Sequence, residues 1–297
     1  MTRMRAVVVA ATDVGRRRDH NEDHHAAWIP EDPAELDRRG ILLMVADGMG
    51  GSQAGEVASK LAADIVVQRY GEAPGADPLA ELKAAVEAAN GVVFQQSLAD
   101  PTMSGMGTTC TALAFRGREA WVAHVGDSRA YMTHGRELHL LTRDHTLVAH
   151  LIEQKELTEE EARTDLRRNV VLRSVGVGEE VEVDAMPIAG PLEPGDTILL
   201  CSDGLHGLVS DEELGQTMQG ADMTLACQDL VALANQRGGP DNITVVMARI
   251  ESVGERAPRA PAMTGAATGR PWIAIVLALL GLAVAVGSVM WLTGRPL

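Results

Sequence analysis

Four aspartates, widely separated in the sequence, each lie in a short glycine-containing motif beside an apolar run of the kind that forms β-strands. The aspartates are Asp47, Asp127, Asp203 and Asp241, and their runs are Ile41–Ala46, Ala120–Val125, Thr197–Cys201 and Ile243–Ile250. The first three aspartates follow their runs, whereas Asp241 precedes its run. Glycine close by gives the backbone room for a ligand beside the carboxylate. The four carboxylates can meet only if the fold gathers these strand ends.

Carboxylates gathered in this way repel one another where no lysine or arginine lies between them. At a separation of ~4 Å and an effective dielectric constant of ~20, each pair costs about 4 kcal/mol. A hard divalent cation removes this cost, and oxygen ligands suit magnesium or manganese. Any one Asp-Gly motif is also a common hairpin turn signal. The combination of motifs, rather than any single one, therefore predicts a metal centre.

The composition limits the classes of fold and partner. With 297 residues, of which 46% are hydrophobic, the chain can form one large core or two small ones. A net charge of −15 argues against a nucleic-acid partner, which requires a basic face. Cys110, Cys201 and Cys227 are odd in number and far apart, which suits a reducing compartment and buried thiols. No Cys-His pattern accompanies Cys201, so a catalytic thiol is disfavoured.

Apolar periodicity and capping residues predict the main elements. The expected helices are Glu56–Tyr70, one starting at Asp77-Pro78, one starting at the capping box of Thr158–Glu161, and Asp222–Gln236. Two strands, Thr108–Phe115 and Glu119–Val125, are expected to be joined by a turn at residues 116–118. Strand-like and helix-like stretches alternate over residues 5–250 without an internal repeat.

Further motifs make the set specific. Before the first aspartate motif come Thr12-Asp13-Val14-Gly15, Arg18 and Asn21-Glu22-Asp23. Over residues 5–250 the chain resembles the metal-dependent protein phosphatases, the type 2C serine/threonine class, in their bacterial form. The four aspartate motifs occur in that family's order, and Leu141–His145 and Arg168–Leu172 resemble the segments that frame the family's flap. The resemblance implies an α+β fold, an α-β-β-α sandwich of two antiparallel sheets flanked by helices.

The resemblance also implies hydrolysis of phosphoserine and phosphothreonine on proteins, by a water activated at two Mn or Mg ions. By resemblance, Asp47 bridges both ions and the carbonyl of Gly48 binds one of them. Asp203 and Asp241 complete one ion, while Glu22 serves the other directly or through water. Asp127 is expected to contribute, with Asp203, to a third ion. The alternative for Asp127 is a residue that holds the turn of the Gly-Asp-Ser-Arg corner.

Two more residues take expected roles in the reaction. Arg18 is expected to bind the substrate phosphate, because a guanidinium fork matches two phosphate oxygens. The family's spacing of Arg before Asn-Glu-Asp selects Arg18 from Arg16-Arg17-Arg18. Asp23 is expected to orient the ligands rather than to bind an ion. Eukaryotic relatives carry a histidine where this chain has Met49, and methionine has no proton to donate. A metal-bound water is then an alternative source of the leaving group's proton.

The nine histidines are assigned to structure or solvent, since none has the spacing of paired metal ligands. The expected partners are phosphorylated proteins, including a cognate serine/threonine kinase and its substrates, with no nucleic acid. Two other classes of function compete with that of a phosphatase. One is a catalytically inactive adaptor that binds phosphoproteins, which the complete ligand set disfavours. The other is a two-metal nuclease or phosphodiesterase, which the acidic charge disfavours.

The end of the chain predicts a membrane anchor after a phosphatase domain of residues 1–252. Residues 253–271 are rich in Ala, Pro and Gly and indicate a flexible linker. Residues 272–292 carry no charge, and a helix of that length spans ~31 Å, which matches a hydrocarbon core of ~30 Å. Trp272 and Trp291 lie at its two ends, followed by a short tail of residues 293–297. Basic residues before the span favour a single-pass protein of the cell membrane with its catalytic domain in the cytoplasm.

Overall fold

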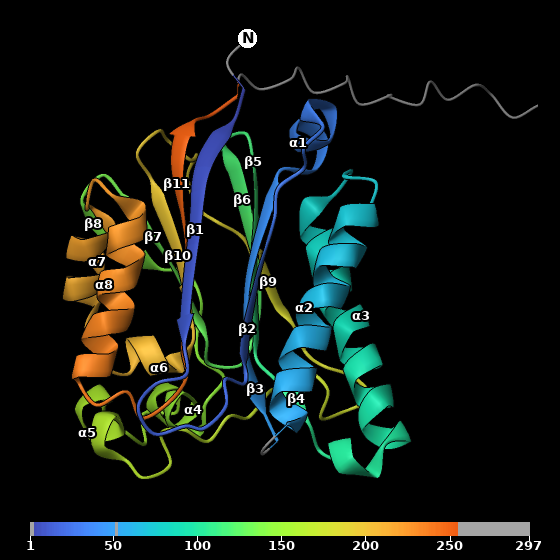
Figure 1. The fold of residues 1–297 in the computed structure, drawn as a ribbon, viewed down its shortest axis with the longest axis vertical. Helices are drawn as coiled ribbons and strands as arrows, with labels where there is room; N and C mark the ends of the chain where they lie inside the picture. The colour runs from blue at the N-terminus through green and yellow to red at the C-terminus, as the bar shows by residue number, and fades with distance from the viewer. Residues whose placement is uncertain (1–2, 51–52, 255–297) are drawn as a thin grey trace, which may run out of the picture. The chain divides into compact units, whose positions relative to one another are not determined.

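Two antiparallel sheets lie face to face at the centre of the computed structural model, which describes residues 3–50 and 53–254 (Figure 1). The first sheet has the strand order β1 (Arg5–Asp13), β11 (Ile243–Ser252), β10 (Thr197–Cys201), β7 (Arg129–His134) and β8 (Glu137–Leu140). The second has the order β2 (Asp23–Trp28), β3 (Ile41–Met49), β5 (Cys110–Arg116), β6 (Glu119–Val125) and β9 (Asp184–Pro187). A short strand, β4 (Gly107–Thr108), pairs with the end of β3.

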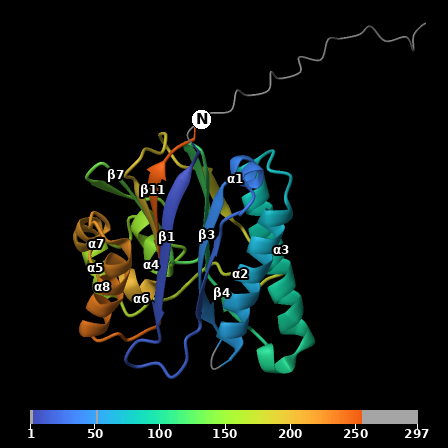
Figure 2. The ribbon, with the colours of Figure 1, turned by 45° about the horizontal axis from the view of Figure 1, so that its top comes forward.

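Helices cover the outer face of each sheet (Figures 1 and 2). The second sheet is covered by α2 (Ala54–Glu72) and α3 (Pro78–Ala99), and the first by α6 (Asp203–His206), α7 (Asp211–Met218) and α8 (Met223–Gln236). The connections contain α1 (Pro33–Arg39), the short helix η1 (Pro101–Met103), α4 (Leu147–Glu153) and α5 (Glu159–Thr164). The prediction of an α+β sandwich with two antiparallel sheets between helices is confirmed for the described residues.

The apolar strand runs of the sequence are explained by three hydrophobic cores. In β3, Leu42 and Met44 pack against the residues of α2 and α3, while Leu43 and Val45 face the opposite sheet. The residues of β10 alternate in the same way between the space separating the sheets and the core beneath α6–α8. Because successive side chains of a strand point to opposite faces, a strand covered on both faces is apolar throughout. Valine, leucine and alanine fill these cores, and few aromatic residues are needed.

Most predicted elements are present with small differences in their ends. The helix predicted at Glu56–Tyr70 extends over Ala54–Glu72, and Asp77 caps α3 by accepting a hydrogen bond of 3.1 Å from the Ala80 amide. The predicted strand Thr108–Phe115 is divided, because Thr109 turns toward Asp47. The Thr109 amide donates to the Asp47 carbonyl at 2.9 Å, and the Asp47 amide donates to the Thr109 hydroxyl at 2.8 Å. The strand is therefore divided by contacts between two residues, Asp47 and Thr109, that are 62 positions apart in the sequence.

The antiparallel arrangement brings all the aspartate motifs to one end of the sandwich. The strands β3, β6 and β10 end there, and β2 and β11 begin there, as the pairs Asp23–Asp47 and Cys201–Val245 show. In Figure 1 this is the lower end, where the loop from β1 to β2 lies. The predicted linker, membrane span and tail of residues 253–297 lie almost entirely outside the described residues. No helix of the described part of the chain is both long and apolar enough to cross a membrane.

Candidate metal centre

Five aspartates share the end of the sandwich and influence one another's ionisation. Asp47 and Asp23 are opposite each other on β3 and β2, and Asp203 is the first residue of α6. Asp127 lies two residues beyond the end of β6, and Asp241 lies two residues before β11. Desolvation raises the pKa of Asp47 well above its usual range, and the charges of the other four aspartates raise it further. The fold therefore brings together the acidic residues that the sequence singled out.

The other buried carboxyl groups show the same effect. Desolvation raises the pKa of Asp23 to about 7 and that of Asp127 to about 7, and the charge of Asp203 contributes to both shifts. Desolvation, followed by the charge of Asp241, raises the pKa of Asp203 to about 6. Burial and like charge both disfavour the ionised carboxylate. The cluster is fully ionised at neutral pH only if positive charge is supplied nearby.

Three acidic oxygens in this cluster are buried without a hydrogen-bond partner: Oε1 of Glu22, Oδ1 of Asp23 and Oδ1 of Asp203. A buried acceptor that makes no hydrogen bond is costly, so such atoms indicate a missing partner. Mg²⁺ and Mn²⁺ favour oxygen ligands of this kind. No three His, Cys, Asp or Glu side chains in the described ranges are already arranged around a single point. The cluster fits ions that keep several waters and take few ligands from the protein.

Two glycines allow the acidic residues to approach one another. A Cβ atom on Gly48 would lie 2.2 Å from the carbonyl oxygen of Gly55 and 2.5 Å from that of Glu22. A Cβ atom on Gly55 would lie 2.8 Å from Oε1 of Glu22. The Gly48 amide donates to the Glu22 carbonyl at 3.1 Å. Any side chain at Gly48 or Gly55 would therefore separate the end of β3, the start of α2 and Glu22.

Asn242 attaches the loop between β1 and β2 to the Asp241 turn. Its Nδ2 donates to the carbonyl oxygens of Val14 and His20, at 3.0 and 2.9 Å, and its Oδ1 accepts from the Glu22 amide at 2.8 Å. Only 3% of Asn242 is exposed. The motif contained this residue, but sequence reasoning gave it no role. A polar residue immediately before a buried strand was the only signal available.

Buried hydroxyl groups hold the central aspartates, and the sequence did not indicate them. The Ser202 hydroxyl donates to Oδ2 of Asp23 at 2.6 Å and accepts from the Thr244 amide at 3.0 Å. The hydroxyls of Thr109 and Ser128 are 2.7 Å apart. These contacts connect residues of both sheets. Asp23 is thus fixed by a hydrogen bond, as an orienting residue would be.

Arg18 lies at the exposed side of the cluster. Its Nη2 donates to Oδ2 of Asp241 at 2.7 Å, and 47% of its side chain is exposed. Arg16 is exposed and contacts this region through its backbone, since its amide donates to the Gly239 carbonyl at 2.7 Å. Met49 is opposite Gly107 at the end of β3. Arg18 therefore lies beside the carboxylates, whereas Met49 has no acidic proton that it could donate.

Comparison with known proteins assigns this arrangement to a family. A family model described as "Protein phosphatase 2C" matches residues 15–240, which contain all the acidic residues of the cluster except Asp241, just beyond its end. The chain belongs to the protein phosphatase 2C family. The serine/threonine protein phosphatase PstP of Mycobacterium tuberculosis is 38% identical over 260 residues, which are 88% of this chain and 48% of that protein. The chain thus matches about half the length of this relative. The serine/threonine phosphatase stp of Listeria monocytogenes is 35% identical over 241 residues, 80% of this chain and 92% of that protein.

Solved structures of protein phosphatase 2C relatives have the same fold. The M. tuberculosis phosphatase PstP/Ppp superposes with a TM-score of 0.74 at 38% identity, covering 83% of this chain and 99% of that one. A structure of the PstP catalytic domain in complex with two manganese ions superposes with a TM-score of 0.72 at 38% identity, covering 82% and 98%. The two-sheet architecture is therefore that of the family.

Proposed function

We propose that this chain is a metal-dependent protein serine/threonine phosphatase that opposes a bacterial serine/threonine kinase. The carrying observation is the set of unpaired acidic oxygens on Glu22, Asp23 and Asp203, gathered at one end of the sandwich. Relatives with the same fold are named serine/threonine phosphatases, and one of them is described with two manganese ions. A manganese or magnesium pair would supply the missing partners of Glu22 and Asp203.

The proposed ligands are Asp47 for both ions, the Gly48 carbonyl for one of them, Asp203 and Asp241 for one ion, and Glu22, directly or through water, for the other. Asp127 and Asp203 are proposed to share a third ion. When bound, the ions lower the pKa of a shared water and neutralise charge on the phosphoryl oxygens. The close approach of Gly48, Gly55 and Glu22 keeps these ligands in place.

The side chains around the cluster orient the substrate and the ligands. Arg18 is proposed to donate two hydrogen bonds to the phosphoryl oxygens, and its exposed position leaves it accessible to a phosphoprotein. Asp23, held by Ser202, orients neighbouring ligands. Met49 cannot donate the proton that the departing alkoxide needs, so that proton must come from another group.

The test compares two ligand variants with the wild type. Asp47→Asn and Asp241→Asn should reduce hydrolysis to background at micromolar manganese while the circular dichroism spectrum is unchanged, because each removes a ligand charge at the end of a strand. The substrates are a phosphothreonine peptide and an autophosphorylated bacterial serine/threonine kinase domain. Asp229→Asn, on the exposed face of α8, is the matched control.

Near-normal activity of either ligand variant would refute the proposed site. Hydrolysis of the peptide without dephosphorylation of the kinase domain would contradict only the opposition to a kinase.

We also propose that residues 272–292 tether the domain to the cell membrane on its cytoplasmic side, on the basis of the uncharged 21-residue stretch.

A further inference from the structure

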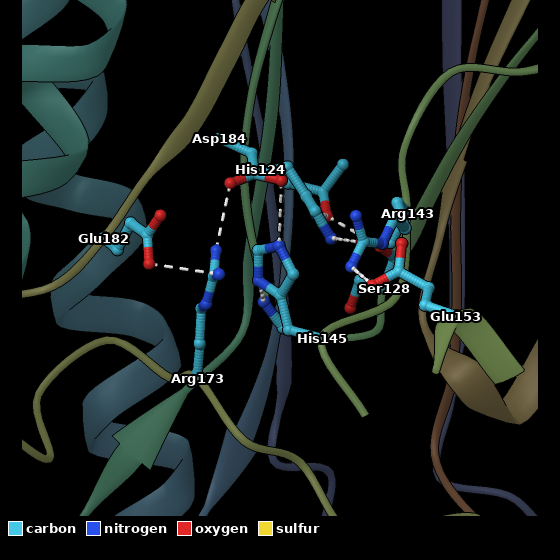
Figure 3. Close-up of polar contacts among 10 residues, drawn as sticks. His124, Ser128, Arg143, His145, Glu153, Arg173, Glu182 and Asp184 are labelled. Carbon is cyan, nitrogen blue, oxygen red and sulfur yellow. Dashed lines mark hydrogen bonds and ion pairs between the residues drawn. The ribbon is translucent and has the colours of Figure 1, made fainter. Parts of the chain in front are cut away.

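His145 is a buried histidine whose ring points toward Asp184 (Figure 3). Only 6% of it is exposed. Residues 146–183 lie between His145 and β9, and we call them the flap segment. His145 contacts both the corner and the flap segment, and the proposed chemistry has so far given it no role.

On one side, His145 holds the peptide groups of Gly126. The His145 amide donates to the Gly126 carbonyl at 2.7 Å, and the Gly126 amide donates to Nδ1 of His145 at 3.1 Å. Gly126 has a φ of +110°, and a Cβ atom there would lie 2.6 Å from Cβ of Thr109. The backbone that leads into Asp127 is therefore fixed by a glycine conformation and by one histidine.

The bond from Gly126 determines where the imidazole proton lies. Nδ1 accepts a hydrogen bond, so the neutral ring carries its proton on Nε2. That nitrogen donates to Oδ2 of Asp184 at 3.2 Å. Burial lowers the pKa of His145, which favours the neutral ring. The ring thus uses one nitrogen for the corner and the other for the start of β9.

On the other side, the His145 carbonyl contacts the flap segment at Leu172, and the His145 ring contacts Asp184 just after the segment. The Leu172 amide donates to the His145 carbonyl at 2.7 Å, next to the bridge between Thr146 and Val171. Arg173 forms ion pairs of 3.0 Å with Asp184 and with Glu182, so Asp184 is held in place for the ring (Figure 3). A single residue therefore contacts the flap segment and the Asp127 corner.

A second imidazole completes the support of Asp127. Nε2 of His206 donates to the Asp127 carbonyl at 2.9 Å, so the peptide groups on both sides of Asp127 are held by histidines. His124 lies beside His145, with ring centroids 4.8 Å apart, and its Nε2 donates to the Arg143 carbonyl at 3.0 Å. His124 does not contact the Gly126 peptide in this way, which distinguishes its position from that of His145.

We infer that His145 is a positioning residue whose Nδ1 fixes the Val125–Gly126 peptide through the Gly126 amide. It thereby sets the backbone that leads into Asp127, and so the direction of the Asp127 carboxylate toward the ion proposed to lie between Asp127 and Asp203. This inference rests on the proposed metal-dependent function. A buried histidine that only fills space contributes the volume of its ring to packing. A positioning residue acts through the hydrogen bond of one ring nitrogen.

Two substitutions separate the two nitrogens. His145→Asn keeps an acceptor oxygen near the position of Nδ1 and loses the donor to Asp184. His145→Gln keeps a donor near the position of Nε2 and loses the acceptor for Gly126. The measurement is titration calorimetry of metal-free protein with Mn²⁺, together with initial rates on a phosphothreonine peptide at increasing Mn²⁺.

We expect His145→Gln to weaken the weakest manganese-binding step by roughly 10- to 100-fold, the effect of losing a residue that orients a ligand. His145→Asn should stay within about threefold of the wild type, well below that range. Asp184→Asn, which leaves the Nδ1 contact in place, should also bind manganese like the wild type. The kcat at saturating manganese should recover in all three variants.

Equal weakening by Asn and Gln would show that the ring only fills space and would overturn the inference. Loss of manganese binding in His145→Asn or Asp184→Asn with a normal His145→Gln would overturn it by assigning the effect to the flap contact. If both His145 variants fail to fold, loss of manganese binding in Asp184→Asn still overturns the inference. Wild-type protein that binds manganese but hydrolyses no phosphopeptide would refute the proposed function alone.

Discussion

Arg18 is held in place by one exposed ion pair, with Asp241. The Nη2–Oδ2 distance is 2.7 Å, and the two side chains are 47% and 28% exposed. Exposed ion pairs contribute about 0–1 kcal/mol, because water screens the charges and two side chains lose freedom. An incoming phosphate with two oxygens offers Arg18 a stronger, bidentate partner. A cation at Asp241 would weaken the present pair further, and so release the guanidinium for the substrate.

Arg18→Ala should therefore raise the KM for a phosphopeptide more than it lowers kcat. Hydrogen bonds to charged groups contribute about 1.5–3 kcal/mol, so kcat/KM should fall by roughly 10- to 150-fold. Steady-state kinetics at saturating manganese measures the effect. Arg16→Ala is the control, because Arg16 contacts the Gly239 carbonyl through its backbone amide, which alanine retains. A large fall in kcat/KM for Arg16→Ala, with no fall for Arg18→Ala, would show that Arg16 rather than Arg18 binds the phosphate.

The aspartates of the site could be predicted from the sequence, and the residues that hold them could not. Asp47, Asp127, Asp203 and Asp241 each lie beside a glycine-containing turn at a strand end, which is a local pattern. Asn242 acts on Val14, His20 and Glu22, which are more than 200 residues away in the sequence. Serine, threonine and asparagine are too common for such a role to be visible before the strands are paired.

At the scale of elements, helix α3 supports the loop that follows Val175, which pairs with Thr108. Asn90 of α3 accepts a hydrogen bond from the Gly176 amide at 2.7 Å. Its Nδ2 donates to the carbonyl oxygens of Gly178 and Glu179, at 3.0 and 3.1 Å. Asn90 is 1% exposed. Val175 pairs with Thr108, whose hydroxyl donates to the Asp47 carbonyl at 2.9 Å, so α3 supports the metal-site end of β3 through this loop.

Asn90→Leu should destabilise the protein by about 1–3 kcal/mol, because it leaves a buried amide and carbonyls without partners. Urea unfolding followed by circular dichroism measures the change. Gln96→Ala, on the exposed side of the same helix, should change stability by less than about 0.5 kcal/mol. An Asn90 variant as stable as the Gln96 variant would mean that water replaces the three hydrogen bonds.

Elements with strong local signals were predictable, and those defined by distant contacts were not. Capping residues located the starts of α3, α5 and α8, and the capping box of Thr158 and Glu161 is present. The break at Thr109 was not predictable, because it depends on hydrogen bonds to Asp47 in another strand. Lys155 has a φ of +59° after α4, which the sequence did not indicate because lysine rarely adopts that conformation.

At the scale of the whole molecule, the first residues of the described chain are bonded to the end of its last strand, β11. The Ser252 hydroxyl at the end of β11 donates to the Arg3 carbonyl at 2.6 Å, and Arg5 pairs with Ser252. A chain that ends after residue 254 therefore keeps β11 complete. We expect it to be soluble, with turnover of a small phosphate ester close to that of the full chain.

The full chain should sediment with membranes and resist extraction by high salt, because ions do not screen hydrophobic insertion. Fractionation of cells that express each form measures this difference. Recovery of the full chain in the soluble fraction would contradict the anchor. Digestion of the domain by protease added to intact cells would contradict its cytoplasmic orientation.

The pairing of β1 with β11 also affects when activity can appear during synthesis. In the sheet, β1 is hydrogen-bonded to β11 alone, so the first strand made must wait for the last. Asp241, which completes the carboxylate cluster, emerges just before β11. Contacts over such distances in sequence form slowly, and a nascent chain exposes unpaired edges until they do. A ribosome-bound chain that stops before residue 243 would lack β11, the strand to which β1 is hydrogen-bonded. The phosphatase site is therefore assembled only when nearly all of the domain has been translated.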